Sequence, residues 1–414
     1  MFFVPIKIGE TSTIPLDHIV TFIQSIPFYK ETYGLILIFV GVIRPFINKT
    51  WNKTKVKTIF SLINILAIPF AVMVVFNIGP EGLLADNMLP FIFGKVAVPV
   101  TTIVPVGSVF LAFMVSYGLM EFIGVFMRPI MVPIWKTPGK SAVDAVASFV
   151  GSYSLALLIT NRVYKEGMYT GKEAAIIATG FSTVSAAFMI IVAKTLGLMD
   201  HWNFYFWSTV VITFIVTAIT ARIFPLRTKP EEYYEGISGD VEQDVTGSKW
   251  NYAINEAITV SKNAPSIIEN TKNNLKDGLG LAFNMAPSLM AVGSLGLIIA
   301  HYTPIFDFVG YIFLPFTWLI RLPEPLLAAK AASTTIAEMF LAAPIVAEAS
   351  MATKYVIGVV SISEILFFSA SIPAMMATEI PLKMSDYFII WIERVILSIL
   401  IAAPFMYVFI NFII

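Results

Sequence analysis

Two carboxylates stand inside apolar stretches of this sequence, and they raise the first functional question. Glu338 lies within AASTTIAEMFLAAPIV, and Glu364 directly follows YVIGVVSIS. A carboxylate buried in a membrane costs about 3 kcal/mol unless it is paired or hydrated. Each could bind a cation or a polar, cationic group of a ligand. Alternatively, each could have a structural role and accept hydrogen bonds from backbone N–H groups where the chain turns or a helix is interrupted. We favour the binding role for both.

The composition predicts an integral membrane protein. The chain has 414 residues, of which 57% are hydrophobic and 13% charged, whereas a soluble domain carries roughly 25% charged residues. Its mean hydropathy is +0.81. The zero net charge provides no electrostatic footprint for nucleic acid, and the absence of cysteine excludes disulfides, thiolate metal sites and cysteine nucleophiles.

Apolar runs predict several membrane spans, since a spanning helix needs about 20 mainly apolar residues. An exterior segment at 1–30, with an interfacial helix near 19–28, precedes them. The lysine-rich loop at 49–57 is predicted to be cytoplasmic, which places both termini outside a bacterial cytoplasmic membrane. The predicted spans before the polar linker are 32–48, 57–79, 99–127, 173–198 and 203–224.

The apolar segment at 141–159 is flanked on both sides by positive charge, from Arg128 to Lys140 before it and from Arg162 to Lys172 after it. A plain spanning helix would have to export one of these clusters, whereas a re-entrant hairpin would keep both on the cytoplasmic side. Its centre, SFVGSYS, is small and polar, as suits a hairpin tip buried in protein. We favour the hairpin, with the plain span as the alternative.

An internal repeat relates the two halves of the chain. A shift of 186 residues aligns EFIGVFMRP, starting at Glu121, with DFVGYIFLP, starting at Asp307, and it aligns the VGS triplets that start at Val106 and Val292. Because the predicted topology gives the copies opposite orientations, we expect inverted repeats with broken helices, which are typical of secondary transporters.

The repeat defines four segments of an all-α membrane protein with two inverted-topology repeats. The polar linker contains the acidic run EEYYEGISGDVEQD, expected to be solvated, and a surface helix expected at 249–276. The segments are 1–98 with the N-terminal spans, 99–224 as repeat 1, 225–277 as the cytoplasmic linker, and 278–414 as repeat 2.

The repeat also selects polar positions. Ser148 and Ser152 share one face of a helix because they are four residues apart, and the repeat pairs them with Thr334 and Glu338. In the next helix a slightly different register pairs Thr179 and Ser182 with Ser361 and Glu364. Tyr153, beside the first tip, could stack on a planar substrate. The predicted substrate- or ion-binding residues are Ser148, Ser152, Tyr153, Thr179, Ser182, Thr334, Thr335, Glu338, Ser361 and Glu364.

Other charged residues are expected to be structural. Asp144 and Lys330 align near the entrances of their hairpins, and Glu121 and Asp307 anchor the interface ends of their helices. Glu393-Arg394 is expected to form a neighbouring charge pair near the inner face. Catalysis is not expected, because the three histidines lie far apart and there is no H-E-x-x-H. Neither a metal site nor a cofactor beyond a coupling Na⁺ or H⁺ is predicted.

The block from Val106 to about Ser185, with VGSVF, EFIGVFMRP, SFVGSYSLALLI and EGMYTGKEAAIIATGFS, resembles the Gate (nucleoside recognition) domain. This domain occurs in concentrative nucleoside transporters, ferrous-iron permeases and sporulation maturation proteins, and the whole chain looks most like the YjiH branch. The resemblance implies that each repeat has an interfacial helix, a re-entrant hairpin and a partly unwound helix. The chain lacks the G-Q-T-E type of hairpin phrase, and the absence of cysteine weakens the iron interpretation.

These features predict a secondary active transporter of a small polar metabolite that works by alternating access. A nucleoside is the family default, and an amino acid or small peptide is the alternative substrate. A non-transporting Gate-domain component of a hetero-oligomeric membrane complex is the alternative from another class. The expected partners are a small-molecule substrate, the lipid bilayer, and either further copies of the chain or a Gate-domain partner subunit.

Overall fold

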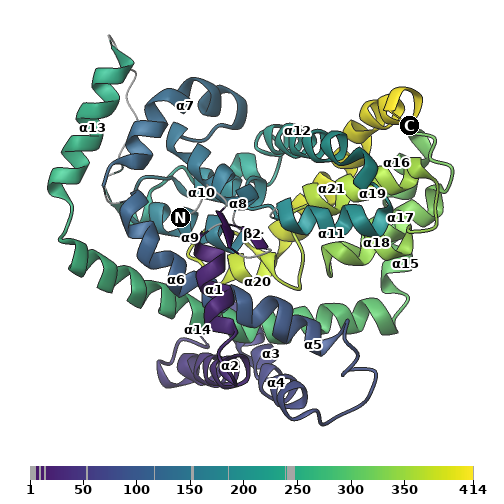
Figure 1. Cartoon of the computed structure of the whole chain (residues 1–414), viewed down its shortest axis with the longest axis horizontal. Coiled ribbons are helices and arrows are strands. Elements are labelled where there is room, and N and C mark those ends of the chain that lie inside the picture. The colour runs from purple at the N-terminus through teal and green to yellow at the C-terminus, as the bar shows by residue number, and fades with distance from the viewer. Residues whose placement is uncertain are drawn as a thin grey trace.

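The computed structural model describes most of the chain, and these residues are almost entirely helical. A short hairpin of β1 (Ile6–Ile8) and β2 (Thr11–Thr13) precedes the helices (Figure 1). The described residues are 6–8, 11–13, 15–52, 55–115, 117–150, 153–184, 186–237, 239 and 248–413.

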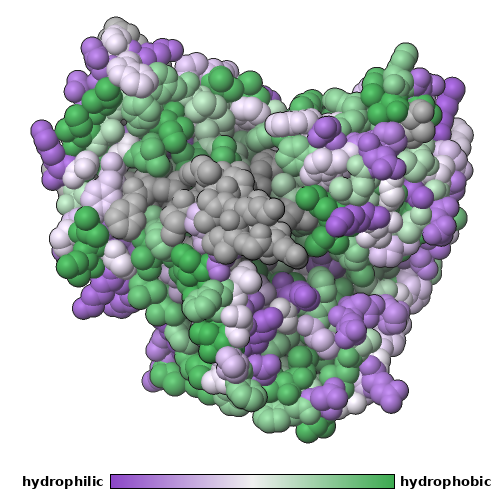
Figure 2. Space-filling view, in the orientation of Figure 1, coloured by the Kyte–Doolittle hydropathy of each residue, from purple (hydrophilic) through white to green (hydrophobic). Residues whose placement is uncertain are grey.

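The N-terminal part supplies helices that precede the repeat. The interfacial helix expected near 19–28 is α1, and it meets α2 at an angle of 94°. Large apolar side chains on α2, α3 and α4 are exposed, and Figure 2 shows green, apolar side chains over the part of the molecule where these helices lie. The elements are α1 (Pro15–Gln24), α2 (Tyr29–Ile47), α3 (Lys55–Asn64), α4 (Ala67–Phe76), α5 (Leu89–Phe91) and the π-helix η1 (Ile92–Ala97).

The two predicted repeats contain similar but not identical series of elements. The first comprises α6 (Val98–Val115), α7 (Leu119–Trp135), η2 (Gly139–Ser141), α8 (Ala142–Val150), α9 (Tyr153–Lys165), α10 (Gly171–Gly180), α11 (Ala186–Leu196), η3 (Met199–His201) and α12 (Trp202–Thr220). The second comprises α14 (Ile267–Tyr302), α15 (Ile305–Gly310), α16 (Leu314–Leu319), α17 (Pro325–Thr334), η6 (Met339–Leu341), α18 (Ala342–Ile345), α19 (Met351–Ser363), α20 (Ser371–Met376), α21 (Met384–Val408) and η7 (Phe409–Ile413). Between them lie η4 (Leu226–Thr228), η5 (Tyr234–Gly236) and α13 (Lys249–Asn263).

Long apolar helices identify a multi-pass membrane protein. Within the described ranges, five helices are long and apolar enough to span a membrane, and α1 with α2 makes a sixth if the bent pair counts as one span. The span expected at 173–198 is not continuous, because α10 ends at Gly180 and α11 begins at Ala186. A similar break separates α19 from α20. The partly unwound helix that the family resemblance implied is therefore present in both halves.

The segment at 141–159 folds back on itself. Thr160 Oγ1 donates a hydrogen bond of 2.6 Å to Asp144 Oδ1, and the Tyr169 hydroxyl donates one of 2.8 Å to Asp144 Oδ2. On a straight helix the 16 residues from Asp144 to Thr160 would span about 24 Å. Helices α8 and α9 thus form a hairpin and not a plain span, and Asp144 has the structural role expected of it.

The two repeated phrases hold the interfacial helices against the hairpins. A Cβ at Gly139, just before α8, would lie 2.1 Å from the Gly124 carbonyl oxygen of α7. A Cβ at Gly310, in α15, would lie 3.0 Å from Lys330 Cα of α17. The Lys330 ammonium also lies 3.2 Å from Asp307 Oδ1. The phrases therefore act as packing corners, and Asp307 anchors its corner through an ion pair.

The opening helices of the two repeats, α6 and α14, pack along each other (Figure 1). A Cβ at Gly278 of α14 would lie 2.4 Å from Ser108 Oγ of α6, so the two backbones approach closely. Helix α14 begins at Ile267, ten residues before the expected end of the linker. The single surface helix expected at 249–276 was therefore wrong, because residues 267–276 form the first turns of this long helix.

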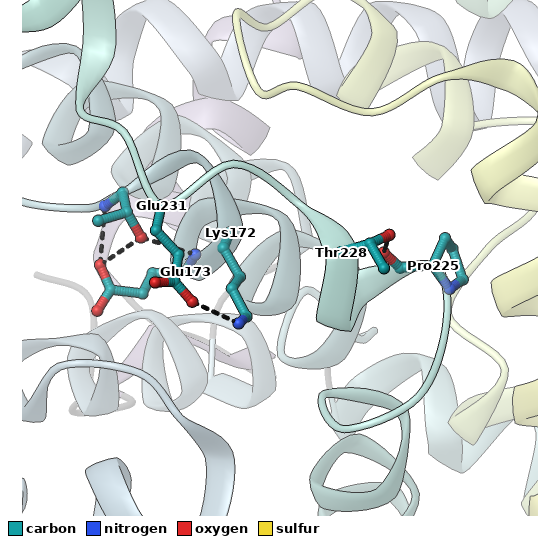
Figure 3. Close-up of polar contacts among 6 residues, drawn as sticks. Lys172, Glu173, Pro225, Thr228 and Glu231 are labelled. Atoms are coloured by element: carbon teal, nitrogen blue, oxygen red, sulfur yellow. Dashed lines mark hydrogen bonds and ion pairs between the residues drawn. The ribbon is translucent and has the colours of Figure 1, made fainter.

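The start of the polar linker is hydrogen-bonded to α10 through its backbone, while the side chains of Glu231 and Glu232 in the acidic run are exposed. The Gly171 and Lys172 backbone N–H groups, unpaired within α10 because they open it, donate to the carbonyls of Glu232 and Pro230 at 2.9 and 2.7 Å. Lys172 Nζ lies 2.7 Å from Glu231 Oε1 (Figure 3), and this ammonium lowers the pKa of the exposed Glu231 carboxyl. We call residues 229–233 the strap.

The strap also reaches the last long helix, because Lys229 forms an ion pair with Asp386 of α21. Both side chains of this pair are buried, with exposed fractions of 9% for Lys229 and 7% for Asp386. Replacing Lys229 by Met should destabilise the protein by about 3 kcal/mol, because Asp386 is left as a buried, unpaired charge.

The matched control is Lys172→Met, whose partner Glu231 is 74% exposed and whose loss should cost less than about 1 kcal/mol. Thermal unfolding of both purified variants measures the difference. Equal shifts of the unfolding midpoint would contradict the conclusion that the Lys229 pair holds the strap.

The contact between α7 and η2 makes Gly139 intolerant of any side chain. Gly139→Ala should lower the free energy of unfolding by about 1–3 kcal/mol, since an added methyl group meets backbone atoms that cannot rotate away. Gly94→Ala is the control, because a Cβ there meets no atom within 4 Å. Thermal unfolding in detergent compares the two, and a Gly139→Ala protein as stable as the control would show that this corner is loosely packed.

Candidate functional site

The two broken helices meet inside the protein. Thr183, in the extended stretch after α10, donates from Oγ1 to the carbonyl of Ile362 near the end of α19, over 3.3 Å. Ser148 of α8 donates from its hydroxyl to the Thr183 carbonyl. The ring of Tyr153, at the start of α9, contacts the ring of Phe367 with centroids 5.9 Å apart. We call this meeting point the junction, formed by residues 180–184 and 362–371 with the hairpin residues beside them.

The second hairpin joins the junction through its backbone. The N–H groups of Phe368 and Ser369 donate to the carbonyls of Ile336 and Ala337 at 2.7 and 2.9 Å. These carbonyls lie between α17 and η6, where the hairpin chain turns. The turn after α19 is therefore hydrogen-bonded through its backbone to the turn of the second hairpin.

Glu338 bonds this tip to the broken helix. The Phe340 N–H donates to Glu338 Oε1 at 3.2 Å, and the Ser369 hydroxyl donates to Oε2. Glu338 is 4% exposed. Because both carboxylate oxygens accept hydrogen bonds from the protein, the structural partner expected for a buried carboxylate is present here.

Glu364 has no such partner. It is fully buried directly after α19, and neither of its side-chain oxygens accepts a hydrogen bond from any described residue. The charged groups that act on it are Arg394, of opposite sign, and Glu338, of the same sign. Since buried carboxylates are ordinarily hydrogen-bonded or paired, Glu364 is the polar group of the junction that most needs a further partner.

Arg394 of α21 connects the ends of both broken helices. Its Nε donates to the Ser363 carbonyl at 2.8 Å, and its Nη1 donates to Thr217 Oγ1 at 3.2 Å. Thr217 lies 2.8 Å from the Gly180 carbonyl oxygen, to which its hydroxyl can donate. Gly180 and Ser363 end α10 and α19, so the guanidinium lies where two helix dipoles present their negative ends.

The sequence interpretation expected Arg394 to form a charge pair with its neighbour Glu393 near the inner face, whereas its guanidinium bonds the ends of the two broken helices. The side chain is 0% exposed and lies at the junction, and Nη2 has no partner among the described residues. Its neighbour Glu393 is only partly buried. An arginine within a long apolar run was the available signal, because intramembrane ionisable residues face protein interiors or polar cavities.

The predicted hydroxyl residues other than Ser148 and Ser152 fall into two groups. Four of them donate to carbonyls three or four residues earlier in their own helices, at 2.8 to 2.9 Å, and these are Thr179, Ser361, Thr334 and Thr335. Thr335 also accepts a hydrogen bond of 3.1 Å from Trp391 Nε1. The hydroxyls of Ser182 and Tyr153 are buried and have no partner in the described part of the chain. Ser152 lies outside the described residues. The structure thus brings Ser148, Tyr153, Ser182, Glu338 and Glu364 to or beside the junction.

Comparison with known proteins places these elements in a family. The Gate family, described as nucleoside recognition, matches residues 97–199, which contain the first hairpin and the first broken helix. An uncharacterized protein of Alkalihalophilus pseudofirmus is 34% identical over 359 residues, covering 82% of this chain and 74% of that protein.

Solved structures share the fold over nearly the whole chain. Two doubly substituted variants of CNTnw, a concentrative nucleoside transporter, in outward-facing states superpose with TM-scores of 0.54 and 0.52. Each is 16% identical, and the match covers 96% of this chain and 97% of the other. This chain therefore belongs to one family with the protein of Alkalihalophilus pseudofirmus, contains a Gate (nucleoside recognition) domain at residues 97–199, and has the fold of CNTnw.

Proposed function

We propose that this protein is a secondary active transporter that carries a small polar solute of the nucleoside type across a membrane, driven by H⁺ or Na⁺. The Gate family match and the CNTnw-like fold support transport over catalysis. Hairpins and discontinuous helices that meet between two structural repeats are the arrangement in which transporters hold substrate and coupling ions. The inverted orientation of the repeats is part of this proposal.

The observation that carries the proposal is the unpaired, buried carboxylate of Glu364 at the break of α19. Leaving a buried polar group without a hydrogen bond costs about 1–3 kcal/mol, and more for a charged group. A protein retains such a cost where a ligand completes the bonding. We therefore assign Glu364 to ligand or ion binding, with the nearby hydroxyls of Ser182 and Tyr153 as further contacts.

The bonding at the junction suits alternating access. Thr183 makes two of the side-chain hydrogen bonds at the junction: its hydroxyl donates to the Ile362 carbonyl of the other half, and its own carbonyl accepts from Ser148. A hydrogen bond of this kind contributes about 1 kcal/mol net, so a bound solute can offset the loss of either. The extensive packing of α6 on α14 is then the fixed frame against which hairpins and broken helices move.

The sidedness follows from shared contacts and from loop charge. The strap, the start of α10 and the start of α21 are bonded together, as expected if the lysine- and arginine-rich loops share one side. We assign that side to the cytoplasm of a bacterial cell, with both termini outside. In the proposed binding region the Tyr153 ring stacks on a planar base. The region also includes Ser148, Ser152, Thr179, Thr334, Thr335, Glu338 and Ser361.

Uptake by proteoliposomes tests the role of Glu364. A thermal-shift screen of nucleosides, amino acids and dipeptides first identifies a stabilising solute by mass action on the folded state. Glu364→Gln should reduce uptake of that solute at least about tenfold, equivalent to about 1.4 kcal/mol of lost interaction, because the amide cannot carry the carboxylate charge.

Glu348→Gln is the matched control, since Glu348 is exposed near the start of α19, and it should retain full uptake. Wild-type rates and ion dependence in Glu364→Gln would contradict the assigned role. No flux of any solute that stabilises the protein would favour a non-transporting component, and stabilisation only by amino acids or dipeptides would replace the nucleoside assignment.

A further inference from the structure

We propose that Arg394 is a built-in cation at the junction, and that the coupling ion of this protein is a proton carried by the Glu364 carboxylate and not Na⁺. The inference deepens the proposed function and rests on it, because it names the ion that drives the same site.

Seven carbonyl oxygens at the two helix breaks already accept hydrogen bonds from the protein. In discontinuous transporter helices, such carbonyls and half-helix C-terminal ends are the groups that coordinate Na⁺. At the first break, Thr217 donates to the Gly180 carbonyl and Ser148 donates to the Thr183 carbonyl. At the second break, Thr183 donates to Ile362 and Arg394 donates to Ser363. The next carbonyls, those of Glu364, Ile365 and Phe367, accept from Leu366, Ser371 and Ile372 in that order.

The guanidinium occupies the position that a coordinated cation would need. It donates directly to the last carbonyl of α19, at Ser363, and it reaches the last carbonyl of α10, at Gly180, through the Thr217 hydroxyl. A positive charge at the C-terminal ends of two helices is favoured by both dipoles. Arginine stays charged in proteins, so this cation is permanent and does not leave with the substrate.

The remaining charges at the junction identify the proton carrier. The charged groups that face Glu364 are Arg394 from α21 and Glu338 from the second hairpin, while α12 contributes only the Thr217 hydroxyl to this cluster. Glu338 receives two hydrogen-bond donors, whereas Glu364 receives none. With one arginine for two carboxylates, a single proton on Glu364 makes the cluster neutral.

A proton removes the buried, unpaired charge of Glu364. The protonated carboxylic acid needs one acceptor and no ring of oxygen ligands. In the transport cycle Glu364 takes up a proton from the side where protons are abundant and releases it on the other side, so that no further reactant is required. The attraction of Arg394 favours the carboxylate and thereby helps the release step.

Thermal unfolding of the purified full-length protein tests whether Na⁺ binds. At equal ionic strength, the unfolding curves of the wild type in sodium chloride and choline chloride should coincide. Arg394→Lys keeps a positive charge and should behave in the same way, while Arg394→Met should acquire an upward shift of the midpoint specific to Na⁺. A saturable, Na⁺-specific shift of the wild-type midpoint would overturn the inference.

Infrared difference spectroscopy tests the proton carrier independently of Na⁺ and of any substrate. Lowering the pH should produce a carbonyl stretching band of a protonated carboxylic acid in the wild type and in the exposed control Glu348→Gln. The band should lose one component in the nearly isosteric Glu364→Gln. An unchanged band in Glu364→Gln would overturn the assignment. If both experiments give the expected results but no solute is taken up, only the proposed function is contradicted, because neither readout requires transport.

Discussion

Two helices of this protein end in its buried interior, and the need to bond their last carbonyls organises the rest of the structure. Inside a membrane no bulk water satisfies a freed backbone group, so protein side chains must do so. Arg394 and Thr217 serve the ends of α19 and α10, and Ser148 serves the stretch beyond α10. These donors come from α21, α12 and α8, which fixes how three further helices surround the breaks.

This constraint divides the molecule into a stable and a weakly bonded part. Helices α6 and α14 pack along their length at glycine contacts such as that of Gly278 on Ser108, where even one methyl group is felt. The junction instead contains polar bonds between extended segments, with unpaired hydroxyls on Ser182 and Tyr153. A hydrogen bond of this kind contributes about 1 kcal/mol net, so single bonds at the junction are more easily exchanged than the close backbone packing of α6 on α14.

Sequence patterns predicted the elements better than the partners of their side chains. Flanking charge indicated the hairpin at 141–159, and the repeat indicated a second copy of the same order. Yet Thr179 and Thr334, chosen for their spacing, bond within their own helices, because a hydroxyl in an apolar helix commonly donates one turn back. Glu338 and Glu364 looked equivalent, and the Phe340 N–H and the Ser369 hydroxyl, which both donate to Glu338, separate them. The partners of Arg394 depend on the packing of α21 against the broken helices, which no local pattern encodes.

The Thr217 hydroxyl has one hydrogen and two carbonyl neighbours, Gly180 and Thr213, each 2.8 Å away. Only one of the two can receive that hydrogen at a time. If α10 draws away from α12, the hydrogen can turn to Thr213 within its own helix, so the count of hydrogen bonds on Thr217 is conserved. Gly180 permits this proximity, because a Cβ there would lie 2.2 Å from Thr217 Cγ2. The contact between α10 and α12 can therefore break through one rotation of the Thr217 hydroxyl, and the hydroxyl keeps a hydrogen-bond acceptor in either position.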